Sequence, residues 1–267
     1  VGVAVLAPVL APPKYAHNPY QMPHKGFSPT PKAPNEKAIF GTTSGQYDIY
    51  YGVVWGTRTA FKIGLFVVII SGFVGVGLGA ISGYYGGWID EFLMRVTDIM
   101  WALPTLVLAM AIVVAFGRGL DKVMIALALI QWRWYVRVTR SEILTLRDQE
   151  FVQAARIMGV SDLKIILRHI LPNAIYPVLI MASMDMGSMV ITASFMSFVG
   201  LGSPKGYADW GQMVALARNY IVGPPDDPLR FWYTIAIPGA CIILFVLAWN
   251  LIGDALRDAF DPKLRRR

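Results

Sequence analysis

Long apolar runs separated by charged connections dominate the 267-residue chain. Three of these runs contain no charged residue, and the charged residue of a fourth is the single acid Asp185. A helix needs roughly 20 apolar residues to cross about 30 Å of hydrocarbon, so each run predicts a membrane-spanning helix. The four predicted spans cover about residues 63–82, 99–117, 174–202 and 231–253.

A fifth span is predicted over about 123–141, where an apolar start is followed by three arginines. Pro104 lies inside the 99–117 run and predicts a kink, because proline cannot complete the helical hydrogen-bond ladder. Residues 1–11 are apolar but would extend only about 17 Å as a helix. We interpret them as the remnant of a first membrane helix that is incomplete in this sequence, with a signal-peptide segment as the alternative.

Composition supports a membrane protein. Charged residues make up 15% of the chain, whereas soluble domains usually carry about a quarter. The net charge of +7 is concentrated in segments that set orientation, so no nucleic-acid partner is expected. Residues 137–173 hold six Lys and Arg and the tail from Asp254 holds five, which predicts a cytoplasmic loop and a cytoplasmic C-terminus in a multi-pass protein of the plasma (inner) membrane.

Residues 12–62 lie outside by the parity of the crossings. Seven prolines between residues 12 and 34 predict an extended segment without regular structure. The aromatic stretch 40–58 is expected at the outer interface, where Tyr and Trp are favoured. Gly75, Gly79 and Gly83 then repeat at four-residue spacing on the first complete span and predict close approach of a second helix.

The cytoplasmic loop 142–173 is the segment that a simple membrane anchor would not need. Its sequence predicts two short amphipathic helices that meet at Gly159, a residue suited to ending a helix, with Ser161 as the cap of the second. Their expected apolar faces are Phe151, Ala154, Ala155 and Met158, then Leu163, Ile166, Leu167 and Ile170. An anionic lipid surface would explain the charges. It would not explain the small Ala154–Ala155 pair, so a groove on a protein partner is favoured.

The loop resembles the cytoplasmic EAA signature of the permease subunits of ATP-binding-cassette (ABC) importers. Ala154, Ala155, Gly159, Leu171 and Pro172 stand at the matching spacing, and Gln153 replaces the usual glutamate. Five stretches are similar to sequences of the dipeptide and oligopeptide branch of these permeases. They are AARIMGVSDLKIILRHILPN, GYYGGWIDEFLMRVTDIMWALP, SFVGLG, DWG and NLIGDALRDAFDPKLR. The chain departs from that branch at two places. The branch usually has a pattern of acidic residues and arginine after a Gly-Thr pair, of which TTSGQYD (42–48) keeps only Asp48, and it commonly has an acid at the position of Ala193.

The resemblance implies a six-helix importer fold of type I, with residues 63–267 as the transmembrane domain. The implied partners are a homologous second permease, two cytoplasmic ATPase subunits that bind ATP and Mg, an external substrate-binding protein and membrane lipid. Peptides are the implied cargo, with oligosaccharides or nickel chelates as alternatives. The residues implied in ATPase coupling are Gln153, Ala154, Ala155, Gly159, Ser161, Asp162, Leu163, Leu171 and Pro172.

The remaining candidate chemistry is sparse. Asp185 lies within a membrane span and, with Ser188 and Thr192, is a candidate for the solute pathway, although a structural hydrogen bond or an ion pair with a partner subunit would explain it equally well. His17 and His24 lack the spacing of a metal pair, and no phosphate-binding glycine loop or catalytic constellation occurs, so no catalytic residue, metal or cofactor is expected in this chain. The rival functions are a secondary transporter with Asp185 as proton carrier, a channel and an intramembrane enzyme.

Overall fold

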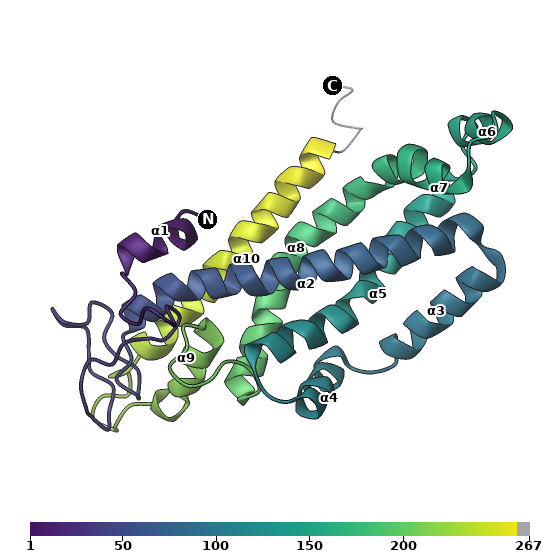
Figure 1. Cartoon of the computed structure of the whole chain (residues 1–267). Coiled ribbons are helices and arrows are strands. Elements are labelled where there is room, and N and C mark those ends of the chain that lie inside the picture. Colours follow the sequence, from purple (N-terminus) through teal and green to yellow (C-terminus); the bar gives the residue numbers. More distant parts are fainter. Residues whose placement is uncertain (261–267) are drawn as a thin grey trace. The chain divides into compact units, whose positions relative to one another are not determined.

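The computed structural model describes residues 1–260, and the regular structure in that range is helical (Figure 1). The α-helices are α1 (Gly2–Leu10), α2 (Ile49–Tyr85), α3 (Gly87–Trp101), α4 (Thr105–Phe116), α5 (Leu120–Leu146), α6 (Glu150–Ile157), α7 (Asp162–Ile165), α8 (Leu171–Val199), α9 (Trp210–Leu216) and α10 (Tyr233–Phe260). A π-helical turn, η1 (Ile166–Ile170), joins α7 to α8, and a 3-10 turn, η2 (Arg218–Tyr220), follows α9.

The chain forms two compact units, each assembled from separate stretches of sequence. The first contains Val1–Leu65, Met110–Ile125 and Gly187–Ala248. The second contains Phe66–Ala109, Ala126–Met186 and the described residues from Trp249 onward.

In the first unit, the proline-rich segment is ordered by hydrogen bonds to other parts of the unit. The Met22 N–H donates to Gly206 O at 2.8 Å, and the Tyr51 hydroxyl donates to Pro19 O at 2.6 Å. Tyr51 and Trp55 are buried in this packing, with Tyr20 edge-on to Trp55 at 5.5 Å. The extended segment therefore covers these two aromatic residues.

Helix α9 packs into the first unit. Asp209 caps it by accepting the Gly211 N–H at 3.1 Å, and Trp210, Gly211 and Met213 are buried. A Cβ at Gly211 would lie 2.4 Å from the Ser194 Cα, so glycine allows the start of α9 to contact the backbone of α8.

In the second unit, α2 and α5 pack backbone to backbone along the three spaced glycines. A Cβ at Gly75 would lie 2.3 Å from the Tyr135 Cβ, and one at Gly79 would lie 2.6 Å from Val136 O. A Cβ at Gly83 would lie 2.9 Å from the Ile143 Cβ. All three distances are shorter than real Cβ contacts, so the glycines set how closely the two helices approach.

The single helix expected over 99–117 is two helices. Helices α3 and α4 are bent by 88° at residues 102–104, a far larger break than a proline kink, because Pro104 directly precedes a new helix rather than distorting an existing one. Arg133, only 1% exposed, is placed to satisfy polar groups freed by the break. Its guanidinium donates to Met100 O and, at 2.6 Å, to the Thr105 hydroxyl, and it lies 4.6 Å from the Trp101 ring centroid.

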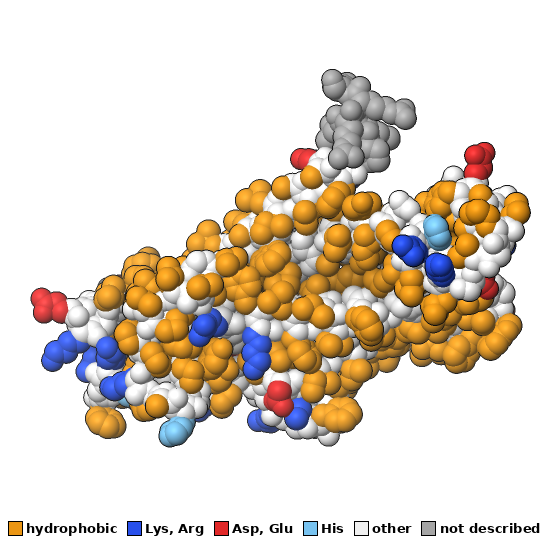
Figure 2. Space-filling model, turned by 45° about the horizontal axis from the view of Figure 1, so that its top comes forward, with side chains coloured by type: hydrophobic (Ala, Val, Ile, Leu, Met, Phe, Trp, Pro, Cys, Tyr) orange, Lys and Arg blue, Asp and Glu red, His pale blue; other side chains and the backbone are white. Residues whose placement is uncertain are grey.

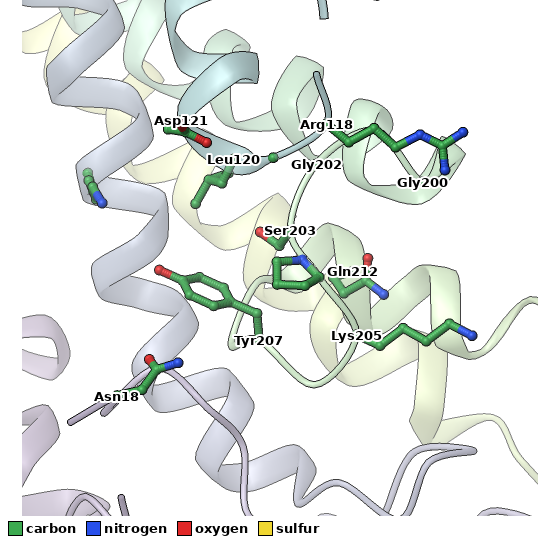
Figure 3. Close-up of a pocket in the computed structure, with 13 residues that line it drawn as sticks. Asn18, Arg118, Leu120, Asp121, Gly200, Gly202, Ser203, Lys205, Tyr207 and Gln212 are labelled. Carbon is green, nitrogen blue, oxygen red and sulfur yellow. The ribbon is translucent and has the colours of Figure 1, made fainter. Parts of the chain in front are cut away.

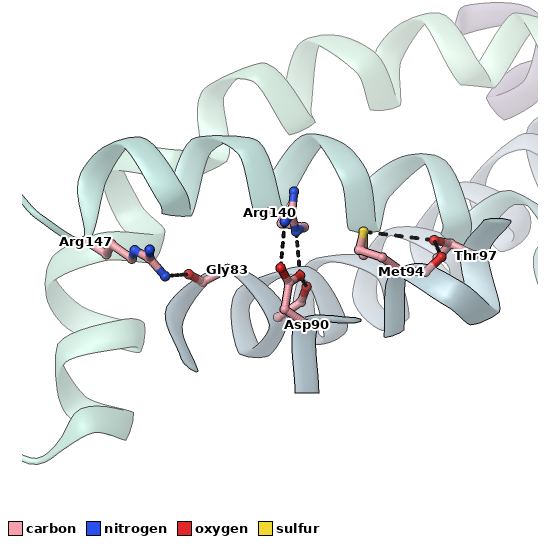
Figure 4. Close-up of polar contacts among 7 residues, drawn as sticks. Gly83, Asp90, Met94, Thr97, Arg140 and Arg147 are labelled. Carbon is pink, nitrogen blue, oxygen red and sulfur yellow. Dashed lines mark hydrogen bonds and ion pairs between the residues drawn. The ribbon is translucent and has the colours of Figure 1, made fainter. Parts of the chain in front are cut away.

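Further along α5, arginines tie the helix to α3 and to the end of α2 (Figure 4). Arg140 donates to both carboxylate oxygens of Asp90 at 2.5 and 2.6 Å, and Ser82 also donates to Asp90. Arg147 donates to Gly83 O at 3.0 Å, a carbonyl in the last turn of α2. The charges on this span, which look unfavourable for a membrane helix in sequence, therefore have partners on neighbouring helices.

Among residues 1–260, three helices are long and apolar enough to cross a membrane: α2, the continuous helix Asp162–Val199, and α10. The bent α3–α4 pair gives a fourth span if it is counted as one. Helix α5, expected as a span over 123–141, carries too many charges to join this set. Figure 2 shows hydrophobic side chains over most of the visible face, and Ile243, Leu244 and Leu251 on α10 are each at least 60% exposed. Such surfaces are typical of helices that face lipid or a partner subunit.

Candidate functional site

The charged segment between α5 and α8 forms one short helix followed by the start of a long one. Helix α6 ends at Ile157, and the next helix continues from Asp162 through η1 into α8 as far as Val199. The second of the two expected short helices is therefore not separate. The π-helical turn, in which Leu171 N–H bonds to Ile166 O, widens the helix just before Pro172 and accommodates the missing N–H of that proline.

Gly159 forms the bend between α6 and α7 in a Schellman motif. The Val160 N–H donates to Ala155 O at 3.1 Å, and the Gly159 N–H donates to Arg156 O at 3.0 Å. The φ angle of Gly159 is +77°, in the left-handed region that favours glycine. A Cβ at this position would meet nothing within 4 Å, so the residue is needed for its backbone conformation and not for space.

A compact apolar cluster holds this segment against the ends of α2, α5 and α8. Val152 and Ala155 of α6 and Ile165 of α7 are at most 2% exposed within it. The other members are Ala80, Tyr84, Ile143, Ile166, Ile170 and Ala174, with Leu146 and Val160 packed at its edge. The segment is therefore part of the fold of the second unit.

Polar contacts add a second connection between the segment and α2. The Tyr84 hydroxyl donates to Asp162 Oδ1 at 2.6 Å, and Arg156 donates to the Tyr84 oxygen at 3.3 Å. The hydrogen bond to Tyr84 is the main cause that raises the pKa of the Arg156 guanidinium above its ordinary value. Tyr84 did not stand out in the sequence, because one tyrosine at the end of a predicted span carries no signal of a long-range partner.

The apolar face that remains exposed differs from the predicted one. Ile157, Met158, Leu163 and Leu167 are 87, 75, 65 and 56% exposed, and Phe151 is also exposed. The predicted face included Ala155, Ile166 and Ile170, which are buried. The error has a physical cause: helical periodicity identifies an amphipathic helix, but here both sides carry apolar residues, and the side with Val152, Ala155 and Ile165 packs on the protein.

The other residues implied in coupling lie around this face. Gln153 is exposed and donates to Asp148 O at 3.0 Å, and Ala154 is exposed. Ser161 occupies the cap position of α7, but its side chain makes no capping hydrogen bond. Leu171 begins α8 half-buried and Pro172 is exposed.

The candidate pathway residues are not gathered into one cluster. In the second unit, Asp185 accepts a hydrogen bond from Gln131 Nε2 at 2.9 Å and borders a cavity of about 360 Å³ with Asp254 and Arg257. In the first unit, the Thr192 hydroxyl donates to Ser188 O at 2.9 Å, within its own helix. In the described part of the chain, no group of three or more His, Cys, Asp or Glu side chains could hold a metal ion.

Comparison with known proteins identifies the family. Residues 75–266 match the family "Binding-protein-dependent transport system inner membrane component". The chain is 37% identical over 264 residues to the dipeptide transport system permease protein DppC of Alkalihalophilus pseudofirmus, covering 98% of this chain and 82% of that protein. It is 36% identical over 234 residues to the glutathione transport system permease protein GsiD of Pectobacterium atrosepticum, covering 88% and 75%.

Solved structures support the fold. A structure of the MetNI methionine ABC transporter in an inward-facing conformation matches with a TM-score of 0.63 at 16% identity, covering 79% of this chain and 97% of that one. An amino acid ABC transporter matches with a TM-score of 0.56 at 16% identity, covering 81% and 94%. The chain belongs to the binding-protein-dependent transport system inner membrane component family, and it is a non-catalytic permease subunit of an ABC importer.

Proposed function

We propose that the exposed apolar face of Ile157, Met158, Leu163 and Leu167 docks into a groove on a cytoplasmic ATPase subunit, and that this contact couples ATP hydrolysis to solute movement. The observation that carries the proposal is the continuity of the helix from Asp162 to Val199. Leu163 lies in the first turn of this helix, which runs for 38 residues. A displacement of the docked end is thereby passed into a membrane helix without a break in the helical run.

A ligand drives a conformational change only through unequal affinity for two states. In this scheme ATP and Mg bind to two partner ATPase subunits. The closure of these two subunits on ATP supplies the difference in affinity between the two states. The apolar cluster and the Tyr84–Asp162 hydrogen bond hold the docking segment firmly enough to transmit force. We place the segment on the cytoplasmic side because residues 137–173 hold six Lys and Arg, which the positive-inside rule favours there.

Short peptides are the proposed cargo, because similar permeases are named for the transport of dipeptides and of glutathione. The remaining proposed partners are a second, homologous permease and an external substrate-binding protein. The Asp185 cavity is the proposed polar point of the solute pathway in this chain. The hydrogen bond from Gln131 stabilises the carboxylate of Asp185, and the adjoining cavity gives this carboxylate access to a solute.

Reconstitution tests the proposal. The complete transporter in vesicles, with its binding protein and ATP, should take up a labelled dipeptide, and an uncoupler should leave uptake unchanged. Uptake that collapses with the uncoupler and persists without ATP would instead identify a secondary transporter, and flux through the purified chain alone would identify a channel. Uptake of a labelled short oligosaccharide or nickel chelate, with no uptake of dipeptide, would overturn the assignment of cargo.

A further inference from the structure

The first unit contains a cavity of about 760 Å³ that the coupling mechanism does not use (Figure 3). Its lining comes from α2, from the turn before α5 and from the 200–212 segment, together with Asn18 of the proline-rich segment. Cavities of about 300–1,000 Å³ are the usual size for small-molecule ligands. The sequence motifs SFVGLG and DWG, which have no part in coupling, border or support this cavity.

Hydrogen bonds and close packing fix the cavity wall. The Ser197 hydroxyl donates to Asp209 Oδ2 at 2.6 Å, which ties the first motif to the second. A Cβ at Gly202 would lie 2.0 Å from the Ser197 Oγ, so only glycine fits there. The Gly119 N–H donates to Leu201 O at 3.1 Å and holds the turn before α5 in place. The cavity is therefore formed in advance of any ligand.

The charge of the lining is positive. Lys62, Arg118 and Lys205 line the cavity, and within residues 1–260 none of the three has an ion-pair partner. The acid in the lining, Asp121, is paired with Lys122 at 2.9 Å. Figure 3 shows Arg118 and Lys205 extending in the same direction in this view, and the amide of Gln212 supplies a further donor to the lining.

Three other cations of the first unit have partners outside the cavity. Lys25 pairs with Asp48 at 3.2 Å, Arg58 lies 5.2 Å from the Trp55 ring centroid, and Arg218 lies 4.5 Å from the Phe198 ring centroid. Unpaired cations beside a polar cavity favour an anionic ligand, because ammonium and guanidinium groups make charge-assisted hydrogen bonds to carboxylates.

We propose that this cavity binds the carboxylate of a small solute on the external side of the permease. The inference rests on the proposed import function and deepens it, since it assigns a free carboxylate, such as the C-terminus of a short peptide, as the group that is recognised. The cations are exposed to solvent and screened by salt, so binding is weak and depends on ionic strength. Weak binding suits a transit site that must release its solute.

Equilibrium binding of dialanine and of dialanine amide to the purified, assembled transporter, without binding protein, tests the proposal. Dialanine should bind more tightly than its amide, and high salt should remove the difference. The triple variant Lys62→Gln, Arg118→Gln, Lys205→Gln should weaken dialanine binding about tenfold or more and leave the amide unchanged. The charge-keeping triple Lys62→Arg, Arg118→Lys, Lys205→Arg should retain most of the binding.

The matched control is Lys14→Gln, Lys32→Gln, Lys37→Gln, which removes the same charge from exposed positions of the same unit outside the cavity. It should leave dialanine binding unchanged. Equal binding of acid and amide, an equal loss in the control, or no loss in the cavity triple would overturn the proposal. Weakened docking of the binding protein with unchanged dialanine binding would assign the cations to that protein instead. Binding is measured without ATP and so does not depend on transport. A transporter that binds dialanine but imports no peptide would contradict the proposed cargo but would still support the carboxylate site.

Discussion

Replacement of Gly159 by aspartate should leave the protein inserted and assembled but abolish both transport and the stimulation of ATP hydrolysis by substrate. The position has space for a side chain, since a Cβ would meet nothing within 4 Å. Its positive φ adds strain of about 1 kcal/mol for most other residues. The larger effect comes from the new carboxylate, which lies beside exposed Met158 and would have to lose its water on docking. Uptake and ATPase rates of the assembled complex measure the effect.

Asparagine is the matched control, because it has the same shape as aspartate, tolerates the left-handed region and carries no charge. Gly159→Asn should therefore keep a substantial part of the transport rate. Equal loss in both variants would attribute the effect to the backbone. Transport at the wild-type rate in Gly159→Asp would contradict the coupling role of the segment.

Replacement of Gly75 by valine should prevent stable folding. A Cβ at Gly75 would lie 2.3 Å from the Tyr135 Cβ and 2.6 Å from Trp132 O, and neither atom is the flexible end of a side chain. Helices α2 and α5 would have to separate, and overpacking of this kind typically costs about 1–3 kcal/mol or more. The yield of monodisperse protein in detergent and its thermal unfolding midpoint should both fall sharply.

Gly77 provides the control on the same helix, two residues away. A Cβ there would meet nothing within 4 Å, so Gly77→Val should give protein of nearly wild-type yield and unfolding midpoint. If the two variants behave alike, the close packing of α2 on α5 is not what the glycines provide.

Much of the architecture follows from apolar length, because each of the four long apolar runs contributes to a helix or a helix pair. The break at residues 102–104 was not predictable in size, since Pro104 is compatible with a kink as well as with a new helix. The role of Arg133 and Arg140 was also hidden. Their charges weaken the sequence signal of α5 as a membrane helix, and only the fold brings Met100 O and Asp90 to them.

The bend of the coupling segment could be predicted from Gly159, because glycine is the residue that ends a helix in the left-handed region. The outward face could not. Ile157 and Ile165 look equivalent in the sequence, yet they are 87% and 0% exposed, because the core is completed by Ala80 and Tyr84, which lie about 80 residues away in the chain.

Cross-linking from single cysteines tests the coupling contact most directly. In a Cys241→Ala background, which removes the one native cysteine, Ile157→Cys and Leu163→Cys present thiols on the exposed face, while Val152→Cys and Ile165→Cys place them in the buried cluster. With a short thiol-reactive cross-linker on the assembled transporter, the two exposed positions should give products with the nucleotide-binding subunit that change in yield with ATP, and the two buried positions should give none. Products with lipid alone, from all the exposed positions and whatever the nucleotide, would contradict the account.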